Sequence, residues 1–142
     1  MFSAHSYGDS RYREAISAKG SEIIGPQFHP VTCFMDYREY VMFLQSCSVM
    51  IMNHRRQQAG GNVSLMLFLG GTVFLRAENP LYHHWRRKGA IFFSVQELEE
   101  DDSLLSYKLS DSKVETNKNI IIASGAWTSC IERTEKLLMK CT

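Results

Sequence analysis

The chain has 142 residues, of which 44% are hydrophobic, so it can bury one core of ordinary domain size. Its 16 Lys and Arg residues nearly balance its 15 Asp and Glu residues, which excludes a global field strong enough to hold nucleic acid. No apolar run approaches the ~18 residues of a membrane span, and no signal peptide begins the chain. We expect a single domain over residues 1–142 and a cytoplasmic protein.

Strand-like and helix-like segments alternate along most of the chain. Short apolar runs predict the strands, and apolar residues at helical spacing predict the helices. In chain order, the predicted elements are a strand at 2–5, a helix at 10–20, a strand at 28–31, a helix from 36 to about 47, a strand at 49–52, a helix at 58–69, a strand at 72–75, a helix at 79–88 and a strand at 91–93. This alternation predicts an α/β fold, a Rossmann-like three-layer parallel sheet.

The pattern is less regular after residue 94. Acidic residues between 97 and 102 indicate a solvated helix start and a surface turn rather than a metal site, because no His or Cys accompanies them. The triplet at 120–122 suits either a strand or a buried helix, and residues 130–140 predict an amphipathic terminal helix. The four cysteines lack the spacing of a zinc site, so we expect free thiols at positions 33, 47, 130 and 141.

The stretch from 49 to 80 says most about function. An apolar strand at 49–52, suited to a sheet covered on both faces, and an apolar helix at 63–69 are joined by a polar turn. A helix start offers unpaired N–H groups and the positive end of a dipole, so the turn predicts a phosphate site. The candidate ligands in this turn are His54, Arg55, Arg56, Gln57, Gln58, Gly60, Gly61 and Asn62.

Several of these residues have a second interpretation. Gly60 and Gly61 can serve a close contact between helix and strand, and the GxGxxG fingerprint is absent. The three potentially cationic side chains at 54–56 favour binding, since they repel one another unless an anion or carboxylates are near. Gln57 and Gln58 either begin the helix or recognise hydroxyl groups and base edges.

Two further turns follow predicted strands. Ligands of open parallel sheets bind at the carboxyl ends of the strands, so we expect these turns and the 53–62 turn to converge on one edge. The first holds Ser6, Tyr7, Gly8 and Asp9, where Tyr7 stacks on a base or covers the core and Asp9 caps a helix or acts as a base. In the second, Asn79 is expected to cap a helix, while Glu78 caps it or binds ligand hydroxyls. His83 and His84 are interpreted as packing or surface residues.

Three motifs resemble those of glycosyltransferase family 56: SYGDSRYRE at 6–14, MNHRRQQAGGN at 52–62 and VFLRAENPLY at 73–82. The segment LFLGGTVFL at 67–75 also resembles the helix-to-strand bend in the donor-binding half of two-domain GT-B glycosyltransferases. The resemblance covers roughly residues 5–110. It implies the C-terminal, donor-binding domain of such an enzyme, with the family's N-terminal acceptor domain absent from this chain.

The resemblance also implies a chemistry. The donor would be a nucleoside-diphosphate sugar similar to thymidine diphosphate N-acetylfucosamine, transferred with inversion to a lipid-linked acceptor in surface polysaccharide synthesis. Arg55 and Arg56 would stabilise the leaving diphosphate, with the other turn residues binding the donor. No cofactor and no metal are implied, and the chain has no Asp-x-Asp motif. Without an acceptor domain the chain alone is expected to be inactive; the full enzyme would associate with the inner membrane surface.

Other classes of function are open. A non-catalytic module that binds a nucleotide sugar would use the same turn without transfer. An α/β signalling domain of receiver type needs acidic residues clustered after the first strand, where Asp9 stands by itself. Nucleic-acid binding ranks last, because the basic cluster is isolated and the formal net charge is +1.

Overall fold

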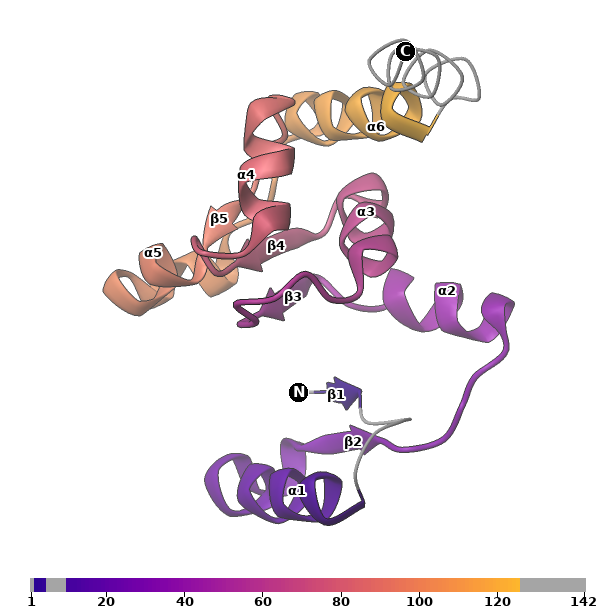
Figure 1. Ribbon diagram of the computed structural model, residues 1–142, viewed down its shortest axis with the longest axis vertical. Helices are drawn as coiled ribbons and strands as arrows, with labels where there is room; N and C mark the ends of the chain where they lie inside the picture. The colour runs from indigo at the N-terminus through magenta and orange to yellow at the C-terminus, as the bar shows by residue number, and fades with distance from the viewer. Residues whose placement is uncertain (1, 5–9, 126–142) are drawn as a thin grey trace, which may run out of the picture. The chain divides into compact units, whose positions relative to one another are not determined.

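The computed structural model describes residues 2–4 and 10–125 (Figure 1). Contacts divide the chain into two units, Met1–Val41 and Met42–Thr142, and each is described by itself. The predicted turn at Ser6, Tyr7, Gly8 and Asp9 and the predicted terminal helix at 130–140 lie outside the described residues. Of the cysteines, Cys33 and Cys47 are free, and the other two also lie outside this range.

The first unit contains two short parallel strands and a helix. Strand β1 (Phe2–Ala4) pairs with β2 (His29–Val31), and between them run α1 (Ser10–Ile24) and a 3-10 turn η1 (Gly25–Gln27). Helix α1 does not end at Gly20 as predicted. A Cβ atom on Gly20 would lie 2.3 Å from the ring of Phe28, so this glycine makes room for a buried aromatic side chain. The residue with the left-handed backbone that ends the helix is Gly25, at φ 69°.

Helix α2 (Tyr37–Gln45) begins with a reciprocal cap. The Glu39 N–H donates to Oδ1 of Asp36 at 3.0 Å, and the Asp36 N–H donates to Oε2 of Glu39 at 3.3 Å. This pair of bonds satisfies amides that the first helical turn leaves unpaired. The predicted helix start at residue 36 is therefore confirmed to within one residue.

The second unit is built on a three-stranded parallel sheet in the order β3 (Val49–Met52), β4 (Thr72–Leu75), β5 (Phe93–Ser94). All four residues of the central strand β4 are buried, whereas Ile51 of β3 is 42% exposed. The parallel α/β prediction is confirmed, but the expectation that β3 is covered on both faces is wrong; β4 has that position. Within the second unit the sheet has three strands, and the first unit pairs β1 with β2, also in parallel.

Two faces of β4 pack against different groups. Val73 and Leu75 join a core that also includes Val63, Met66, Leu67, Leu81, Trp85, Ala90 and Phe92. Phe74 points to the other side, where it stacks on Phe93 at 5.6 Å between ring centroids. The ring of Tyr107 meets Phe93 edge-on at 5.2 Å. The core therefore sits on both sides of the central strand.

The helices of this unit are α3 (Gly60–Leu69), α4 (Pro80–Arg87), α5 (Val95–Glu100) and α6 (Asp111–Gly125), with a 3-10 turn η2 (Asp102–Ser106). The ambiguous triplet at 120–122 is part of α6, which packs against α3. Gly70 ends α3 at φ 86°, and a Cβ atom there would lie 2.9 Å from Cγ1 of Val114 in α6. None of the helices within the described range combines the length and the apolar character that a membrane crossing requires.

Strand β5 starts two residues later than predicted. The side chain of Asn117, fully buried in α6, accepts a hydrogen bond from the N–H of Ile91 at 2.8 Å and donates one to its C=O at 2.9 Å. Both backbone groups of Ile91 are therefore taken by a helix side chain and are not available for pairing with β4.

The acidic stretch forms the solvated helix start and surface turn that the sequence predicts, since Glu97, Glu99, Glu100, Asp101 and Asp102 are all exposed. Glu97 also completes a capping box with Ser94 at the start of α5. Burial raises the pKa of Glu97, but hydrogen bonds from the Ser94 N–H and Oγ–H, with Arg86 3.8 Å away, lower it by more. The net pKa lies below the ordinary value of 4.5.

This shift predicts acid sensitivity. A carboxyl group whose pKa is lowered by folding contributes stability above its unfolded pKa, and the contribution is lost as the pH falls through the folded pKa. Denaturant unfolding from neutral pH to pH 3 should show stability falling below about pH 4.5, and Glu97→Gln should lose part of that dependence. The control Glu99→Gln, exposed in the same helix, should keep the wild-type profile; equal profiles for all three proteins would contradict the assignment.

Candidate functional site

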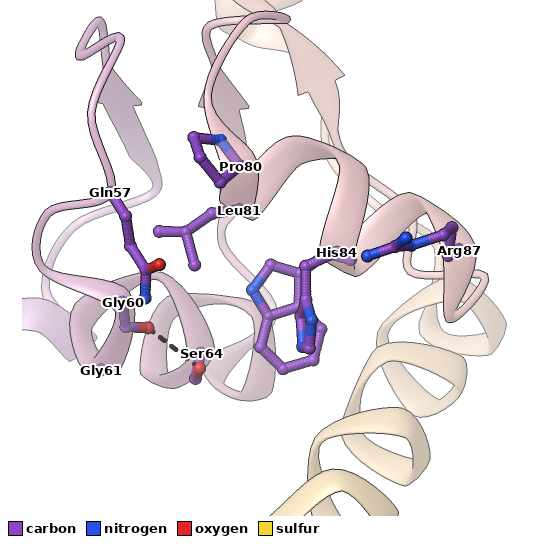
Figure 2. Close-up of a pocket in the computed structure, with 9 residues that line it drawn as sticks. Gln57, Gly60, Gly61, Ser64, Pro80, Leu81, His84 and Arg87 are labelled. Atoms are coloured by element: carbon purple, nitrogen blue, oxygen red, sulfur yellow. Dashed lines mark hydrogen bonds between the residues drawn. The ribbon is translucent and has the colours of Figure 1, made fainter. Parts of the chain in front are cut away.

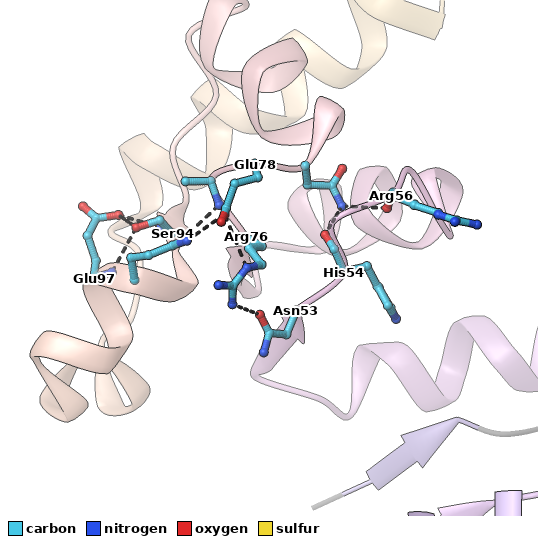
Figure 3. Close-up of polar contacts among 10 residues, drawn as sticks. Asn53, His54, Arg56, Arg76, Glu78, Ser94 and Glu97 are labelled. Atoms are coloured by element: carbon cyan, nitrogen blue, oxygen red, sulfur yellow. Dashed lines mark hydrogen bonds and ion pairs between the residues drawn. The ribbon is translucent and has the colours of Figure 1, made fainter. Parts of the chain in front are cut away.

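The loop between β3 and α3 is fixed by one buried side chain, Asn79. Its Nδ2 group donates to the backbone C=O of His54 at 2.8 Å and of Arg56 at 3.0 Å (Figure 3), while its Oδ1 accepts from the Leu81 N–H at 2.9 Å. The predicted cap on α4 is thus confirmed. Because both ends of the amide are bonded within the protein, Asn79 holds the site in place and offers no group to a ligand.

The cationic side chains of this loop are exposed. His54, Arg55 and Arg56 make no ion pair within the described part of the chain, and the side chain of Arg56 extends away from the polar contacts around Asn79 (Figure 3). We call these three residues the basic rim. Asn79 holds the backbone of this loop, while the three side chains are exposed to solvent.

Polar residues that follow the three strands of the second unit bond to one another at the carboxyl edge of the sheet. Nη1 of Arg76 donates to Oδ1 of Asn53 at 2.8 Å, and Nε of Arg76 lies 3.4 Å from Oε2 of Glu78. The side chain of Gln96, in α5, donates to Oε2 of Glu78 at 2.8 Å and accepts from the Ala77 N–H at 3.1 Å. Asn53 follows β3, Arg76 follows β4 and Gln96 follows β5, so these hydrogen bonds and this ion pair connect the segments that follow all three strands.

Glu78 is a charged member of this cluster. A hydrogen bond from its own backbone N–H and the bond from Gln96 are the main causes that lower its pKa below 4.5; desolvation opposes them, and the charges of Arg76 and Arg55 add smaller lowering effects. It is therefore ionised at neutral pH and oriented by two neighbours. A fixed carboxylate at the open end of a parallel sheet is suited to accept hydrogen bonds from hydroxyl groups.

A pocket of about 590 Å³ lies beside this edge, between the start of α3 and one face of α4 (Figure 2). Its lining residues are Gln57, Gly60, Gly61, Ser64, Pro80, Leu81, His84, Trp85 and Arg87. The structure therefore brings three of the predicted residues, Gln57, Gly60 and Gly61, to one pocket. His54, Arg55, Arg56, Gln58, Asn62 and Glu78 do not line it, and the residues at 6–9 are outside the described range.

Gly60 and Gly61 are not required by packing. A Cβ atom on Gly60 would make an ordinary contact with Leu81 at 3.5 Å, one on Gly61 would meet nothing within 4 Å, and neither residue has positive φ. The preceding residue, Ala59, has φ 49° and its side chain caps nothing. The first amides of α3 are thus left open beside the pocket, with the positive end of the helix dipole.

Five lining residues from α4 were not among the predicted ligands: Pro80, Leu81, His84, Trp85 and Arg87. Of these, His84 was interpreted as a packing or surface residue, and the others were given no ligand role. Their spacing contains part of the missing information, since Leu81, His84 and Trp85 recur at helical spacing near one face, and Arg87 lies beyond His84 at the margin of that face. Only the packing of α4 beside α3 shows that this face borders a pocket.

Comparison of the chain with known protein families, curated proteins and solved structures finds no match.

Proposed function

We propose that the second unit binds a nucleoside-diphosphate sugar, with the diphosphate at the start of α3. The observation that carries this proposal is the uncapped helix start, where Gly60 and Gly61 expose backbone amides to a pocket without any packing need for glycine. Amide N–H groups and a helix dipole stabilise phosphate oxygens. A volume of about 590 Å³ is also in the range of ordinary ligand pockets.

The surroundings of the pocket suit the rest of such a ligand. Arg55 and Arg56 make the loop that leads into α3 positively charged, with His54 beside them, and the ionised carboxylate of Glu78 lies at the carboxyl edge of the sheet, next to the chain's entry into α4. The rim would attract the negatively charged donor, and Glu78 would accept hydrogen bonds from hydroxyl groups of a ribose or sugar.

More specifically, we propose that this unit is the donor-binding domain of a glycosyltransferase. Arg55 and Arg56 would stabilise the charge that develops on the leaving diphosphate, in inverting transfer to a lipid-linked acceptor. The donor would be similar to thymidine diphosphate N-acetylfucosamine. The support for this form is the resemblance of the motifs at 52–62 and 73–82 to glycosyltransferase family 56, together with the open amides at the start of α3. An acceptor domain would have to be supplied in addition.

One observation favours the alternative, a non-catalytic module that binds a nucleotide sugar. Neither Arg55 nor Arg56 lines the pocket, so a ligand can be held there without a guanidinium at the leaving phosphate. Incubating the chain with nucleotide sugar and a lipid acceptor, and measuring released diphosphate, separates the two functions. Release supports the transferase, while binding without release, even when an acceptor domain is added, supports the module.

Binding itself is tested by isothermal titration with thymidine and uridine diphosphate. We expect binding in the micromolar to millimolar range and about tenfold weaker binding by the double variant Arg55→Ala, Arg56→Ala, because the anion loses two nearby positive charges; tenfold corresponds to about 1.4 kcal/mol. The control Arg38→Ala changes an exposed arginine of α2 and should bind as wild type. No binding at millimolar nucleotide, or equal binding by the double variant, would count against the proposal.

A further inference from the structure

We infer that Gln96, at the start of α5, is a positioning residue: its amide orients the carboxylate of Glu78 to receive a hydroxyl group of the ligand. This inference rests on the proposed function, because it concerns the part of the nucleotide sugar that carries hydroxyl groups. Gln96 follows β5 and lies 18 residues after Glu78 in the chain. Only the fold brings the two side chains together.

The position of Gln96 is set by the first turn of α5. It is the second residue of this helix, between the buried Val95 and Glu97. The Glu97 N–H donates to Oγ of Ser94 at 3.0 Å, and the N–H and the hydroxyl of Ser94 both donate to the Glu97 carboxylate. This capping box fixes the backbone of the turn, so the Gln96 side chain leaves the helix from a defined point.

The amide of Gln96 is bonded at both ends. Its Oε1 accepts from the Ala77 N–H at 3.1 Å, and its Nε2 donates to Oε2 of Glu78 at 2.8 Å. The first bond decides which way round the amide lies, because a backbone N–H can be met by the amide oxygen and not by its NH2 group. The NH2 group is then directed to Glu78. One side chain therefore fixes both the backbone before Glu78 and its carboxylate.

The side chains around Glu78 hold its carboxylate through one oxygen. Nε of Arg76 lies 3.4 Å from Oε2, the same oxygen that Gln96 contacts (Figure 3). Arg76 is held in turn by Asn53, whose Oδ1 accepts from Nη1 of Arg76 at 2.8 Å. Oε1 takes part in none of these side-chain contacts, and the Glu78 side chain is 51% exposed. Because a carboxylate accepts about four hydrogen bonds, it keeps capacity for a ligand.

The charge of Glu78 decides which part of the ligand it meets. The bonds from its own N–H and from Gln96 keep its pKa below 4.5, so it is negative at neutral pH and repels a diphosphate. A carboxylate accepts hydrogen bonds and donates none, so its partner is a hydroxyl group of the ribose or sugar. Pro80, two residues after Glu78, lines the pocket, so this carboxylate lies on the segment that leads into the pocket wall.

The test compares two ligands by isothermal titration: uridine diphosphate, which carries hydroxyl groups, and inorganic pyrophosphate, which carries no sugar. Gln96→Ala removes both bonds, whereas Gln96→Glu keeps an acceptor for the Ala77 N–H and turns a second carboxylate toward Glu78. We expect both variants to bind uridine diphosphate about fivefold more weakly and pyrophosphate as wild type does. Gln45, exposed at the end of α2, is the matched control, and Gln45→Ala and Gln45→Glu should change neither affinity.

A double-variant cycle shows whether Gln96 acts through Glu78. Glu78→Ala should also weaken binding of uridine diphosphate about fivefold. Adding Gln96→Ala to it should cause no further loss, because the carboxylate that Gln96 orients is gone. The pKa of Glu78, followed by nuclear magnetic resonance of its carboxyl carbon, should rise in Gln96→Ala and stay unchanged in Gln45→Ala.

Failure of this inference and failure of the proposed function give different results. If Gln96→Ala binds uridine diphosphate as wild type while the double variant Arg55→Ala, Arg56→Ala binds it more weakly, the inference is wrong and the proposed function stands. Additive losses in the cycle, or an equal loss of affinity for pyrophosphate, overturn the inference alone, since they indicate an effect that does not pass through Glu78. If the wild-type chain binds neither ligand, both are overturned.

Discussion

Replacing Asn79 with alanine is expected to lower the free energy of unfolding by about 3 kcal/mol. The buried side chain forms three hydrogen bonds, one that caps α4 and two that hold the backbone of the loop at His54 and Arg56. Without this side chain, the Leu81 N–H and the C=O groups of His54 and Arg56 lose these partners. Asn79 is 1% exposed, so water does not readily take its place. Urea denaturation measures the effect directly.

Asn79→Asp separates the two roles of this residue. A carboxylate keeps an oxygen for the Leu81 N–H, so α4 remains capped, but it places a second oxygen against the C=O groups of His54 and Arg56. We therefore expect nucleotide binding to weaken strongly, because the loop that leads to the pocket is no longer pinned. The control Asn53→Ala removes an exposed asparagine bonded to Arg76 and should cost less than about 1 kcal/mol. An Asn79→Ala loss no larger than this control would show that the loop does not depend on Asn79.

Replacing Asn117 with alanine is expected to cost about 2 kcal/mol, for a different reason. This residue lies in α6, is fully buried, and bonds both the N–H and the C=O of Ile91, just before β5. Alanine leaves both backbone groups unpaired and opens a small cavity, so the attachment of α6 to the sheet is weakened. The measurement is again the free energy of unfolding.

Asn119, exposed on the same helix, is the matched control for Asn117. Asn119→Ala should change stability by less than about 0.5 kcal/mol, since surface substitutions away from specific contacts have small effects. A further readout is hydrogen exchange at the Ile91 amide, which should become faster in Asn117→Ala and stay slow in the control. Similar stabilities for the two variants would contradict the role of this side chain.

Local signals in the sequence were sufficient for several parts of the fold. The strand at 72–75, the cap at Asn79 and the helix start at residue 36 follow from apolar runs and capping chemistry, which act over a few residues. The late start of β5 could not be predicted, because Ile91 is bonded by a residue 26 positions further along the chain. The same holds for Gly20, whose role depends on the ring of Phe28 rather than on helix propensity.

The candidate site shows the same division. The start of α3 was predicted as an anion site from the polar turn and its glycines, and the structure gives Gly60 and Gly61 open backbone beside a pocket. A pattern along one segment, however, cannot say which side chains from another helix complete the pocket. The sequence pattern predicted ligand roles for Arg55 and Arg56, which lie on the loop before α3, and predicted none for Trp85 and Arg87, which line the pocket.

By itself, the sequence determined the α/β character, the parallel pairing of the strands, the cap on α4 and, to within two residues, the start of α3, because each depends on residues close together in the chain. Tertiary structure alone decided that β4 is the buried central strand of the second unit, that Asn117 replaces part of a strand ladder, and that α4 faces the start of α3. These features depend on contacts between segments far apart in sequence, where burial and hydrogen-bond satisfaction of the whole unit select the arrangement.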